Sequence, residues 1–285
     1  MSGILAVGTR KGLFLLRQGK GGAWEMDPPA FLGAPVSMVA ARSGGQQLFA
    51  ALDHGHFGVK LHHSEDGGRT WTERSAPAFP ADAAAKDAAE APSVSLVWSL
   101  EAGSHEGVDV LWAGTIPGGL FRSDDDGESW SLIRGLWDLP ARADWFGGGY
   151  DDPGIHSICI DPRDSLHIAI AVSCGGVWRS ADFGETWTAA GKGLWAAYVP
   201  PERREDPEYQ DPHRMVQCST APDNYWIQHH NGIFFTEDGR KPGGRSSRCP
   251  SPISDSPWRY IRSIQGRPGS CRRSPTKSGS PATVP

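Results

Sequence analysis

Short apolar segments, separated by glycine or polar turns, recur along the first 240 residues of the chain. Residues 4–7, 155–160 and 168–172 are examples. Segments of this length that are bounded by turn residues are typical of β-strands, so the pattern predicts an all-β fold. The sequence contains no run of about 18 apolar residues, which excludes a transmembrane helix.

An Asp-rich turn follows these strands at a nearly constant interval. Three segments that begin at Ser64, Ser123 and Ser180 share the pattern Ser-x-Asp-x-Gly-x-Thr/Ser-Trp, and a fourth, incomplete copy contains Asp238. The aspartates of the four copies lie 59, 57 and 56 residues apart. Each unit holds a strand, a turn, a second strand, a glycine turn, a third strand, the Asp-rich turn and a Trp-bearing strand. Four short antiparallel strands per repeat predict the blades of a β-propeller.

The residue types of the Asp-rich turn indicate a structural role. Serine and aspartate side chains two residues apart can hydrogen-bond within their own hairpin, glycine adopts a positive φ without strain, and tryptophan can cover the turn. We therefore predict that these positions stabilise hairpins and take no part in chemistry. They are Ser64, Asp66, Gly68, Trp71, Ser123, Asp125, Gly127, Trp130, Ser180, Asp182, Gly184, Trp187 and Asp238.

The repeated turn resembles the Asp-box, or BNR repeat, and residues 1–240 resemble the bacterial WD40/YVTN/BNR-like propeller family of the sialidase-like, glycosyl hydrolase-like superfamily. Beyond the turns, the resemblance rests on Gly-Thr-Arg-Lys-Gly-Leu-Phe at residues 8–14 and on Asp-His-Gly-His-Phe-Gly-Val at residues 53–59. It also rests on residues 134–137, 153–158 and 228–232. It implies a propeller of six or seven four-stranded blades, of which this sequence would hold about four and a partial one. It implies no particular activity, because one fold supports many functions.

The composition changes at Lys241, inside the fourth Asp-rich turn. The last 45 residues contain ten Ser, eight Pro and nine basic residues against one acid, Asp255. We therefore divide the chain into a propeller at residues 1–240 and a basic tail at residues 241–285, which is either disordered or the product of a reading-frame shift. A tail that binds nucleic acid or an anionic surface is the alternative for this segment. The net charge of −5 thus combines an acidic propeller with a basic tail.

The N-terminus and the cysteines bear on the cellular compartment. The chain begins with a predicted strand and lacks the basic region, apolar stretch and cleavage site of a signal peptide, so we expect a cytoplasmic protein that does not bind membranes. The five cysteines are odd in number and never spaced as Cys-x-x-Cys. We therefore expect neither a disulfide framework nor a zinc ribbon from Cys159, Cys174, Cys218, Cys249 and Cys271.

Several histidines are expected where a propeller has its central mouth. Alignment of the repeats places Trp98, His156 and His213 at the start of the first strand of their units, and other candidates follow the second strand. Loops at this end carry variable chemistry in propellers. The candidate ligand-binding residues are Arg10, His54, His56, Trp98, Trp145, His156, His213, His229 and His230.

Three interpretations of these histidines remain open. They can bind a divalent metal with Asp144, Asp152 or Asp211 nearby, hold a sugar or an anion, or hydrogen-bond between blades. Metal-ligand spacing such as His-x-x-x-His does not occur in the sequence, so we assign no cofactor and keep the metal as a hypothesis.

An enzyme and a binding scaffold are both compatible with the sequence. A glycosidase needs two carboxyls, and the candidate catalytic residues are Asp152, Glu101, Asp144 and Asp211. The early Arg-Ile-Pro motif of sialidases is absent, and no tyrosine matches their nucleophile, so we do not expect sialidase activity. Residues 144–150, rich in glycine and aromatics, form the most promising loop. We predict a scaffold that binds a small molecule, a glycan or a protein at the mouth, without nucleic acid, and keep a glycosyl hydrolase-like enzyme as the alternative.

Overall fold

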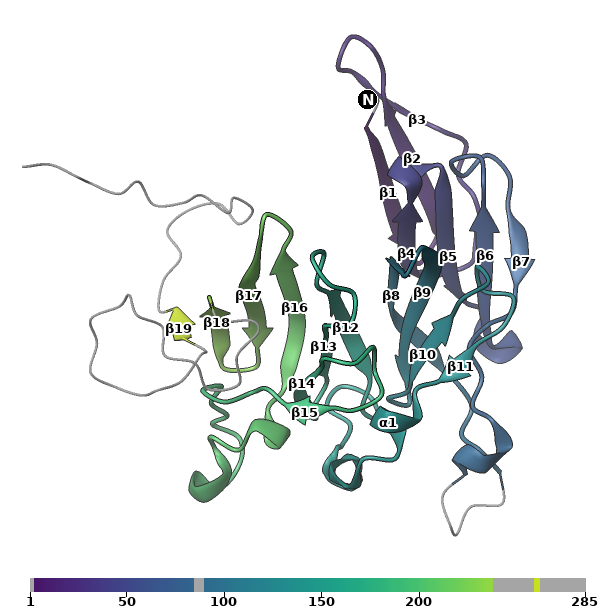
Figure 1. Cartoon of the computed structure of the whole chain (residues 1–285). Coiled ribbons are helices and arrows are strands. Elements are labelled where there is room, and N and C mark those ends of the chain that lie inside the picture. Colours follow the sequence, from purple (N-terminus) through teal and green to yellow (C-terminus); the bar gives the residue numbers. More distant parts are fainter. Residues whose placement is uncertain (1–2, 85–89, 238–258, 262–285) are drawn as a thin grey trace, which may run out of the picture.

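The computed structural model describes residues 3–84, 90–237 and 259–261, and these residues form five antiparallel sheets arranged as propeller blades along an arc (Figure 1). Blade 1, at one end of the arc, has three strands, and each of the other four blades has four. The predicted all-β propeller of four-stranded antiparallel blades is therefore confirmed. The described residues hold five blades, however, and not the six or seven that the resemblance implied.

Each blade uses consecutive strands, and within blades 1 to 4 these strands are joined by short hairpins. Blade 1 contains β1 (Ile4–Thr9), β2 (Gly12–Gln18) and β3 (Trp24–Met26), and blade 2 contains β4 (Val36–Arg42), β5 (Gln47–Asp53), β6 (Val59–Ser64) and β7 (Thr72–Arg74). Blade 3 contains β8 (Leu96–His105), β9 (Val108–Ile116), β10 (Leu120–Ser123) and β11 (Ser131–Leu132). Blade 4 contains β12 (Ile155–Ile160), β13 (Ile168–Val172), β14 (Gly176–Ser180) and β15 (Thr188–Ala189). Blade 5 contains β16 (Pro212–Cys218), β17 (Ala221–His229), β18 (Gly232–Thr236) and β19 (Arg259–Ile261).

The helical elements are single turns in the connections. They are α1 (Arg134–Trp137) and the 3-10 turns η1 (Ser43–Gly45), η2 (Gly55–Phe57), η3 (Ala81–Ala83), η4 (Pro140–Asp144), η5 (Pro201–Arg203) and η6 (Pro207–Tyr209). No helix in the described residues is long and apolar enough to cross a membrane.

The hydrophobic core lies between neighbouring blades. The first strand of each of blades 2 to 5 contacts the first strands of the adjacent blades, so these strands line the inside of the arc. One apolar cluster joins blades 3 and 4 through Trp112, Ile158, Ile170 and Trp178, and similar clusters join the other neighbours. A strand such as β13 is covered on both faces and is therefore apolar at every position rather than alternating.

The three complete Asp-rich segments form hairpin turns with a shared hydrogen-bond pattern. In the turn that begins at Ser64, the serine hydroxyl donates to Asp66 Oδ1 at 2.8 Å and accepts from the backbone N–H of Gly68 at 2.7 Å. Asp66 also accepts the N–H and the hydroxyl of Thr70 at 2.9 and 2.7 Å. These bonds from Thr70 hold the pKa of Asp66 well below its ordinary value. The carboxylate thus replaces backbone bonds that the tight turn cannot make.

The glycine of each turn rests on the preceding blade. Gly127 has a φ of 85°, and a Cβ atom there would lie 2.6 Å from the Cδ2 atom of Leu61 in blade 2. The turn therefore needs glycine for its conformation and also for the close approach of the two blades. The indoles differ in their partners: Trp71 and Trp187 donate to their own turn glycines, whereas Trp130 donates to the carbonyl of Ser75 in the preceding blade.

The C-terminal region and the cysteines differ in part from what the sequence predicted. Asp238 lies outside the described residues, as do Cys249, Cys271 and the rest of the predicted tail apart from residues 259–261. These three residues form β19, which pairs with β18, although the tail was expected to lack strands. Cys159 and Cys174 are free and buried, whereas Cys218 in β16 is disulfide-bonded, a bond that was not predicted from the sequence.

The inner strand of blade 1 has an unpaired edge among the described strands. β1 is the innermost strand of blade 1 and pairs with β2 alone. In the other blades the strand equivalent to β1 is the second strand, and its inner edge pairs with an additional first strand, namely β4, β8, β12 or β16. Leu5 and Val7 of β1 are 50% and 37% exposed. An exposed apolar edge strand promotes pairing with another chain.

We expect Leu5→Lys to reduce self-association of the full chain, because a charged side chain on an edge strand opposes edge-to-edge pairing. Sedimentation velocity over a range of concentrations measures this effect. Val108→Lys, at an exposed position in β9, is the control and should leave association unchanged. Equal association of Leu5→Lys and the wild type would show that this edge is not where copies meet.

We expect Ser180→Ala to lower the stability of the propeller. Ser180 is buried, and its hydroxyl donates to Asp182 at 2.7 Å and accepts from the N–H of Gly184 at 2.8 Å. Removing the hydroxyl leaves that buried N–H without its acceptor, which costs about 1–3 kcal/mol. Thermal unfolding followed by circular dichroism should show a Tm lower by several degrees, while Ser131→Ala, at an exposed position in β11, should match the wild type. An unchanged Tm for Ser180→Ala would contradict the structural role of this turn.

Candidate functional site

The inner strands of blades 2 to 5 each contain a register irregularity at the same place. The ladder to the second strand skips Ser37 in β4, Trp98 in β8, His156 in β12 and His213 in β16. A bulge adds one residue to a strand and re-aims its side chain. The alignment that made Trp98, His156 and His213 equivalent is thus matched by the structure, which adds Ser37 as the fourth member.

These bulges lie at the end of the blades that carries the connections between blades and the turns between second and third strands. We call this end the interblade face, and the opposite end, with the Asp-rich turns, the hairpin face. Bulges are frequent next to functional sites because they direct one side chain out of the regular ladder.

His156 is the most buried of the bulge residues. Its ring lies 5.6 Å from the ring of Trp98, its Nδ1 atom is 2.9 Å from the hydroxyl of Ser157, and its carbonyl accepts from Arg214 at 3.2 Å. Burial lowers the pKa of His156 to about 4. The imidazole is therefore neutral near pH 7 and contributes no charge to the interblade face. The ring of Tyr150 also meets that of Trp98 edge-on, with ring centroids 5.2 Å apart.

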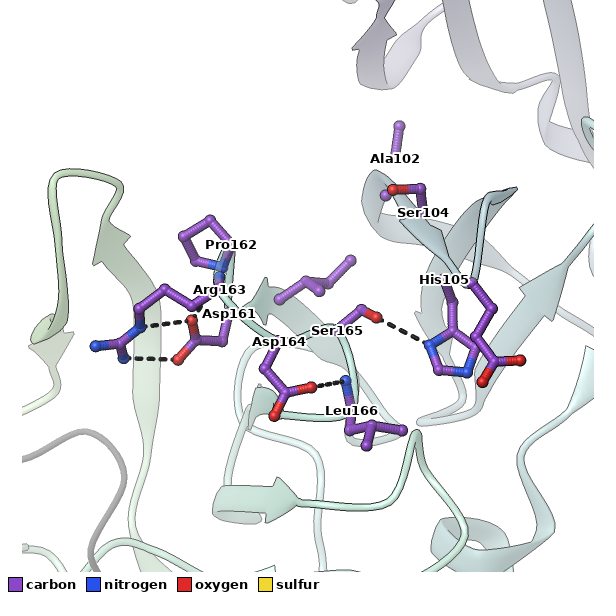
Figure 2. A pocket seen from close by; sticks show the side chains of 12 residues that line it. Ala102, Ser104, His105, Asp161, Pro162, Arg163, Asp164, Ser165 and Leu166 are labelled. Atoms are coloured by element: carbon purple, nitrogen blue, oxygen red, sulfur yellow. Dashed lines mark hydrogen bonds and ion pairs between the residues drawn. The ribbon is translucent and has the colours of Figure 1, made fainter.

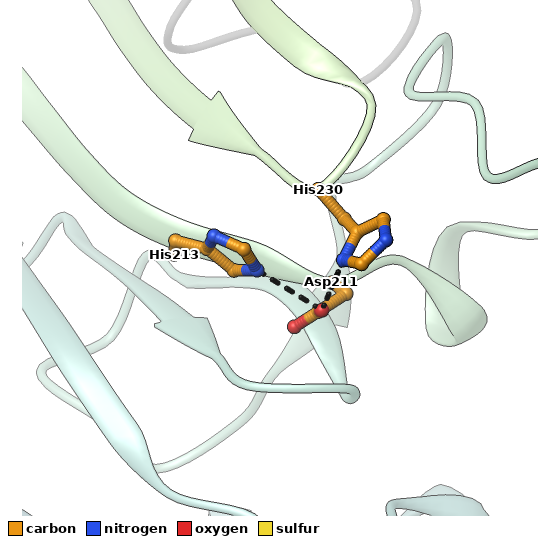
Figure 3. Close-up of side chains that lie close together, drawn as sticks. All are labelled: Asp211, His213 and His230. Atoms are coloured by element: carbon orange, nitrogen blue, oxygen red, sulfur yellow. Dashed lines mark hydrogen bonds and ion pairs between the residues drawn. The ribbon is translucent and has the colours of Figure 1, made fainter. Parts of the chain in front are cut away.

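Asp211, His213 and His230 lie together where blade 5 begins (Figure 3). The Oδ2 atom of Asp211 is 3.1 Å from Nε2 of His213 and 3.6 Å from Nδ1 of His230. The Oδ1 atom of Asp211 accepts the N–H of Cys174 at 3.1 Å, which ties blade 5 to blade 4. The backbone N–H of Asp211 donates to Nε2 of the buried His229 at 3.1 Å, and burial lowers the pKa of His229 to about 4. His229 thus binds the backbone of the cluster as a neutral ring.

Two long connections surround this cluster on the interblade face: residues 133–154, which include α1 and η4, and residues 190–211, which include η5 and η6. They contact each other through η4 and η6 and both bond to the β13–β14 turn, where the N–H of Phe146 donates to Cys174 and the N–H of Gly176 donates to Gln210. They carry four large side chains that are 40% to 52% exposed, namely Phe146, Tyr150, Trp195 and Tyr198. The ring of Tyr198 lies 5.2 Å from that of His230.

The other predicted site residues are spread over different environments. Trp145 is only 7% exposed and belongs to the core between blades 3 and 4, next to Trp178, so it is not available to stack on a ligand. Asp144 and Asp152 are exposed. Arg10, His54 and His56 are also at the interblade face, but they lie in exposed turns of blades 1 and 2.

Glu101 is the candidate catalytic carboxyl with a shifted pKa. It lies half-buried on the inner strand β8. Burial raises its pKa, and the nearby charge of Arg214 opposes that rise. A raised pKa is a property of the general acid of a glycosidase.

The hairpin face carries a cavity that the sequence did not indicate. It has a volume of about 650 Å³ and lies between the β8–β9 and β12–β13 turns (Figure 2). Of its lining residues, Arg163 forms ion pairs with Asp161 at 2.7 Å and with Asp223 of β17 at 2.6 Å, and Nδ1 of His105 lies 2.9 Å from the hydroxyl of Ser165. These residues fall in hairpin turns without a repeated motif, so no sequence signal pointed to them.

The fold of this chain has similar solved structures, whereas its sequence has no match among known families. No model of a known protein family and no curated protein matches the sequence. The GH74 xyloglucanase from Xanthomonas campestris matches 90% of this chain with a TM-score of 0.51 and 13% identity, and an ancestral GH74 enzyme matches 80% with a TM-score of 0.49 and 15% identity. The chain covers only 36% and 24% of these two enzymes. A structure of YCF48 bound to D1 peptide matches 82% of the chain and 74% of its own length, with a TM-score of 0.36 and 16% identity. Such identities show the propeller fold alone.

The neutral state of His156 makes stability depend on pH. The folded state binds this proton only near pH 4, whereas the unfolded chain binds it near the ordinary pKa of 6.5. Stability should therefore be unaffected above about pH 6.5 and fall as the pH drops toward 4, by about 3 kcal/mol for this group. Urea unfolding of His156→Gln should show a smaller loss between pH 7 and pH 4 than the wild type. His56→Gln, at an exposed ring, should keep the wild-type slope, and an unchanged slope in His156→Gln would refute the assignment.

Proposed function

We propose that this protein is a ligand-binding scaffold and that its ligands dock on the interblade face of blades 3 to 5. The observation that carries the proposal is the set of exposed aromatic rings on the two long connections, of which Tyr198 lies against the exposed imidazole of His230. Aromatic side chains in water are unusual in the absence of a partner, and tyrosine and tryptophan are enriched at binding surfaces.

The surface is preorganised for binding. The hydroxyl of Tyr198 donates to the carbonyl of Tyr209 at 2.9 Å, and the ring of Tyr150 is held against Trp98. Arg204 lies over the ring of Trp195 at 5.8 Å. Rings that are already fixed lose little conformational freedom when a ligand arrives, so more of the contact energy becomes affinity.

The chemistry of the surface favours a ligand with both apolar and polar groups. The aromatic rings offer flat apolar faces, while Asp211 and the two imidazoles offer directional hydrogen bonds. A glycan, a small polar molecule or a peptide has this combination.

The test uses arrays of oligosaccharides and of peptides, followed by titration calorimetry with the member that binds most strongly. We expect Tyr150→Ala and Tyr198→Ala each to weaken that binding by about tenfold or more, because they remove central aromatic contacts. Leu166→Ala, at an exposed side chain beside the cavity of the hairpin face, is the control and should bind as the wild type does. Binding that is lost in Leu166→Ala and kept in both tyrosine variants, or the absence of any bound member, would contradict the proposal.

A glycosyl hydrolase-like enzyme is the second candidate, and the raised pKa of Glu101 is the observation in its favour. A glycosidase requires a second carboxylate, for which Asp144, Asp152 and Asp211 are the candidates. Turnover of aryl glycosides by the full chain, abolished in Glu101→Gln, would support the enzyme. Lack of turnover by the wild type would leave binding as the function.

We also propose that the Ser-Asp turns are Asp-box hairpins and that the chain belongs with the bacterial WD40/YVTN/BNR-like propellers in the cytoplasm. The hydrogen-bond pattern shared by the turns at Ser64, Ser123 and Ser180 supports the hairpin assignment.

A further inference from the structure

We propose that Asp211, His213 and His230 form a binding site for a transition-metal ion, zinc being the first candidate. One oxygen and two ring nitrogens of these residues lie within 4.8 Å of one another (Figure 3). Two ligands of a tetrahedral zinc ion, each about 2.0–2.1 Å from the metal, are themselves about 3.3 Å apart. The distances of 3.1 and 3.6 Å from Asp211 Oδ2 to the two imidazoles lie on either side of that value.

The backbone fixes the three ligands relative to each other. Pro212 of β16 pairs with His229 of β17, so the residues just outside this pair, Asp211 and His230, are brought side by side. The N–H of His230 donates to the carbonyl of Asp211 at 3.1 Å, and His213 is the bulge residue that follows Pro212. The convergence thus rests on the ladder of blade 5 and does not depend on a free loop.

Neighbouring groups orient two of the ligands. Asp211 is held by the N–H of Cys174, and only 10% of its side chain is exposed. The Nδ1 atom of His213 lies 3.1 Å from the side-chain amide of Gln228, whose oxygen can accept a hydrogen bond from Nδ1–H after rotation of the amide. That arrangement leaves the lone pair of Nε2 directed toward Asp211 and the metal position. Hydrogen bonds of this kind fix the tautomer of metal-binding histidines.

The donor set and its exposure define the class of metal. Two imidazoles and one carboxylate favour zinc or another first-row transition metal over magnesium or calcium, which prefer oxygen. The side chains of His213 and His230 are 42% and 56% exposed, so an ion held by three protein ligands would keep open positions toward solvent. Tyr198 lies beside His230 at the rim, where an additional ligand would approach.

The test is a titration of the untagged full chain with Co²⁺, read by visible absorption, and with Zn²⁺, read by calorimetry. We expect one equivalent of each metal to bind, and His213→Gln and His230→Gln each to weaken binding by about tenfold or more. Asp211→Asn keeps an acceptor for Cys174 and should also weaken binding. Thermal melts of the variants establish that they are folded.

A matched control is available in blade 4. The Nε2 atom of His167 lies 3.4 Å from Asp164. Among the residues that the structure describes, no third metal-binding side chain joins this His–Asp pair. His167→Gln should therefore bind metal as the wild type does. Failure of the wild type to bind either metal, or equal binding by His213→Gln and the wild type, would overturn the proposal. Neither outcome bears on the array experiment, because metal binding is measured without any organic ligand.

Discussion

The extra residue in the inner strands of blades 2 to 5 is the constraint on which the interblade face depends. A regular antiparallel ladder turns alternate residues of a strand toward opposite faces of the sheet. The bulge at His213 interrupts that alternation for one residue, as it does at Trp98 and His156 in the neighbouring blades. Each of these blades thus directs one side chain out of the regular ladder while the rest of the strand continues to pair.

The stability of the arc comes from contacts between blades, and the site inherits its rigidity from them. Apolar clusters fill the space between adjacent sheets, and the glycines of the Asp-rich turns allow those sheets to approach closely. The bond from Cys174 in blade 4 to Asp211 in blade 5 is the polar counterpart of these contacts. The carboxylate is thereby positioned by two blades, which gives the cluster a fixed geometry although its two imidazoles face solvent.

Much of the architecture could be predicted from the sequence, because repetition is visible in a single chain. The spacing of the Asp-rich turns indicated the blades, and the alignment of Trp98, His156 and His213 anticipated equivalent positions that the structure identifies as bulges. The meeting of Asp211 with His230 was not predictable, since it follows from the register of one hairpin. The core position of Trp145 was missed because a segment rich in glycine and aromatics does not reveal which ring turns inward. The expectation of six or seven blades came from the family resemblance, whereas the repeats of the chain itself indicated about four blades and a partial one; the described residues hold five.

The central claim is that the register of blade 5 brings one carboxylate and two imidazoles to a single point. X-ray absorption at the zinc edge of the zinc-loaded full chain tests this most directly, because it reports which atoms surround the ion. The account predicts a shell of nitrogen and oxygen at about 2.0–2.1 Å together with the outer-shell scattering of two imidazole rings, and loss of one ring's contribution in His230→Gln. A sulfur shell at about 2.3 Å, or a spectrum unchanged by that substitution, would place the metal elsewhere in the chain and contradict the claim.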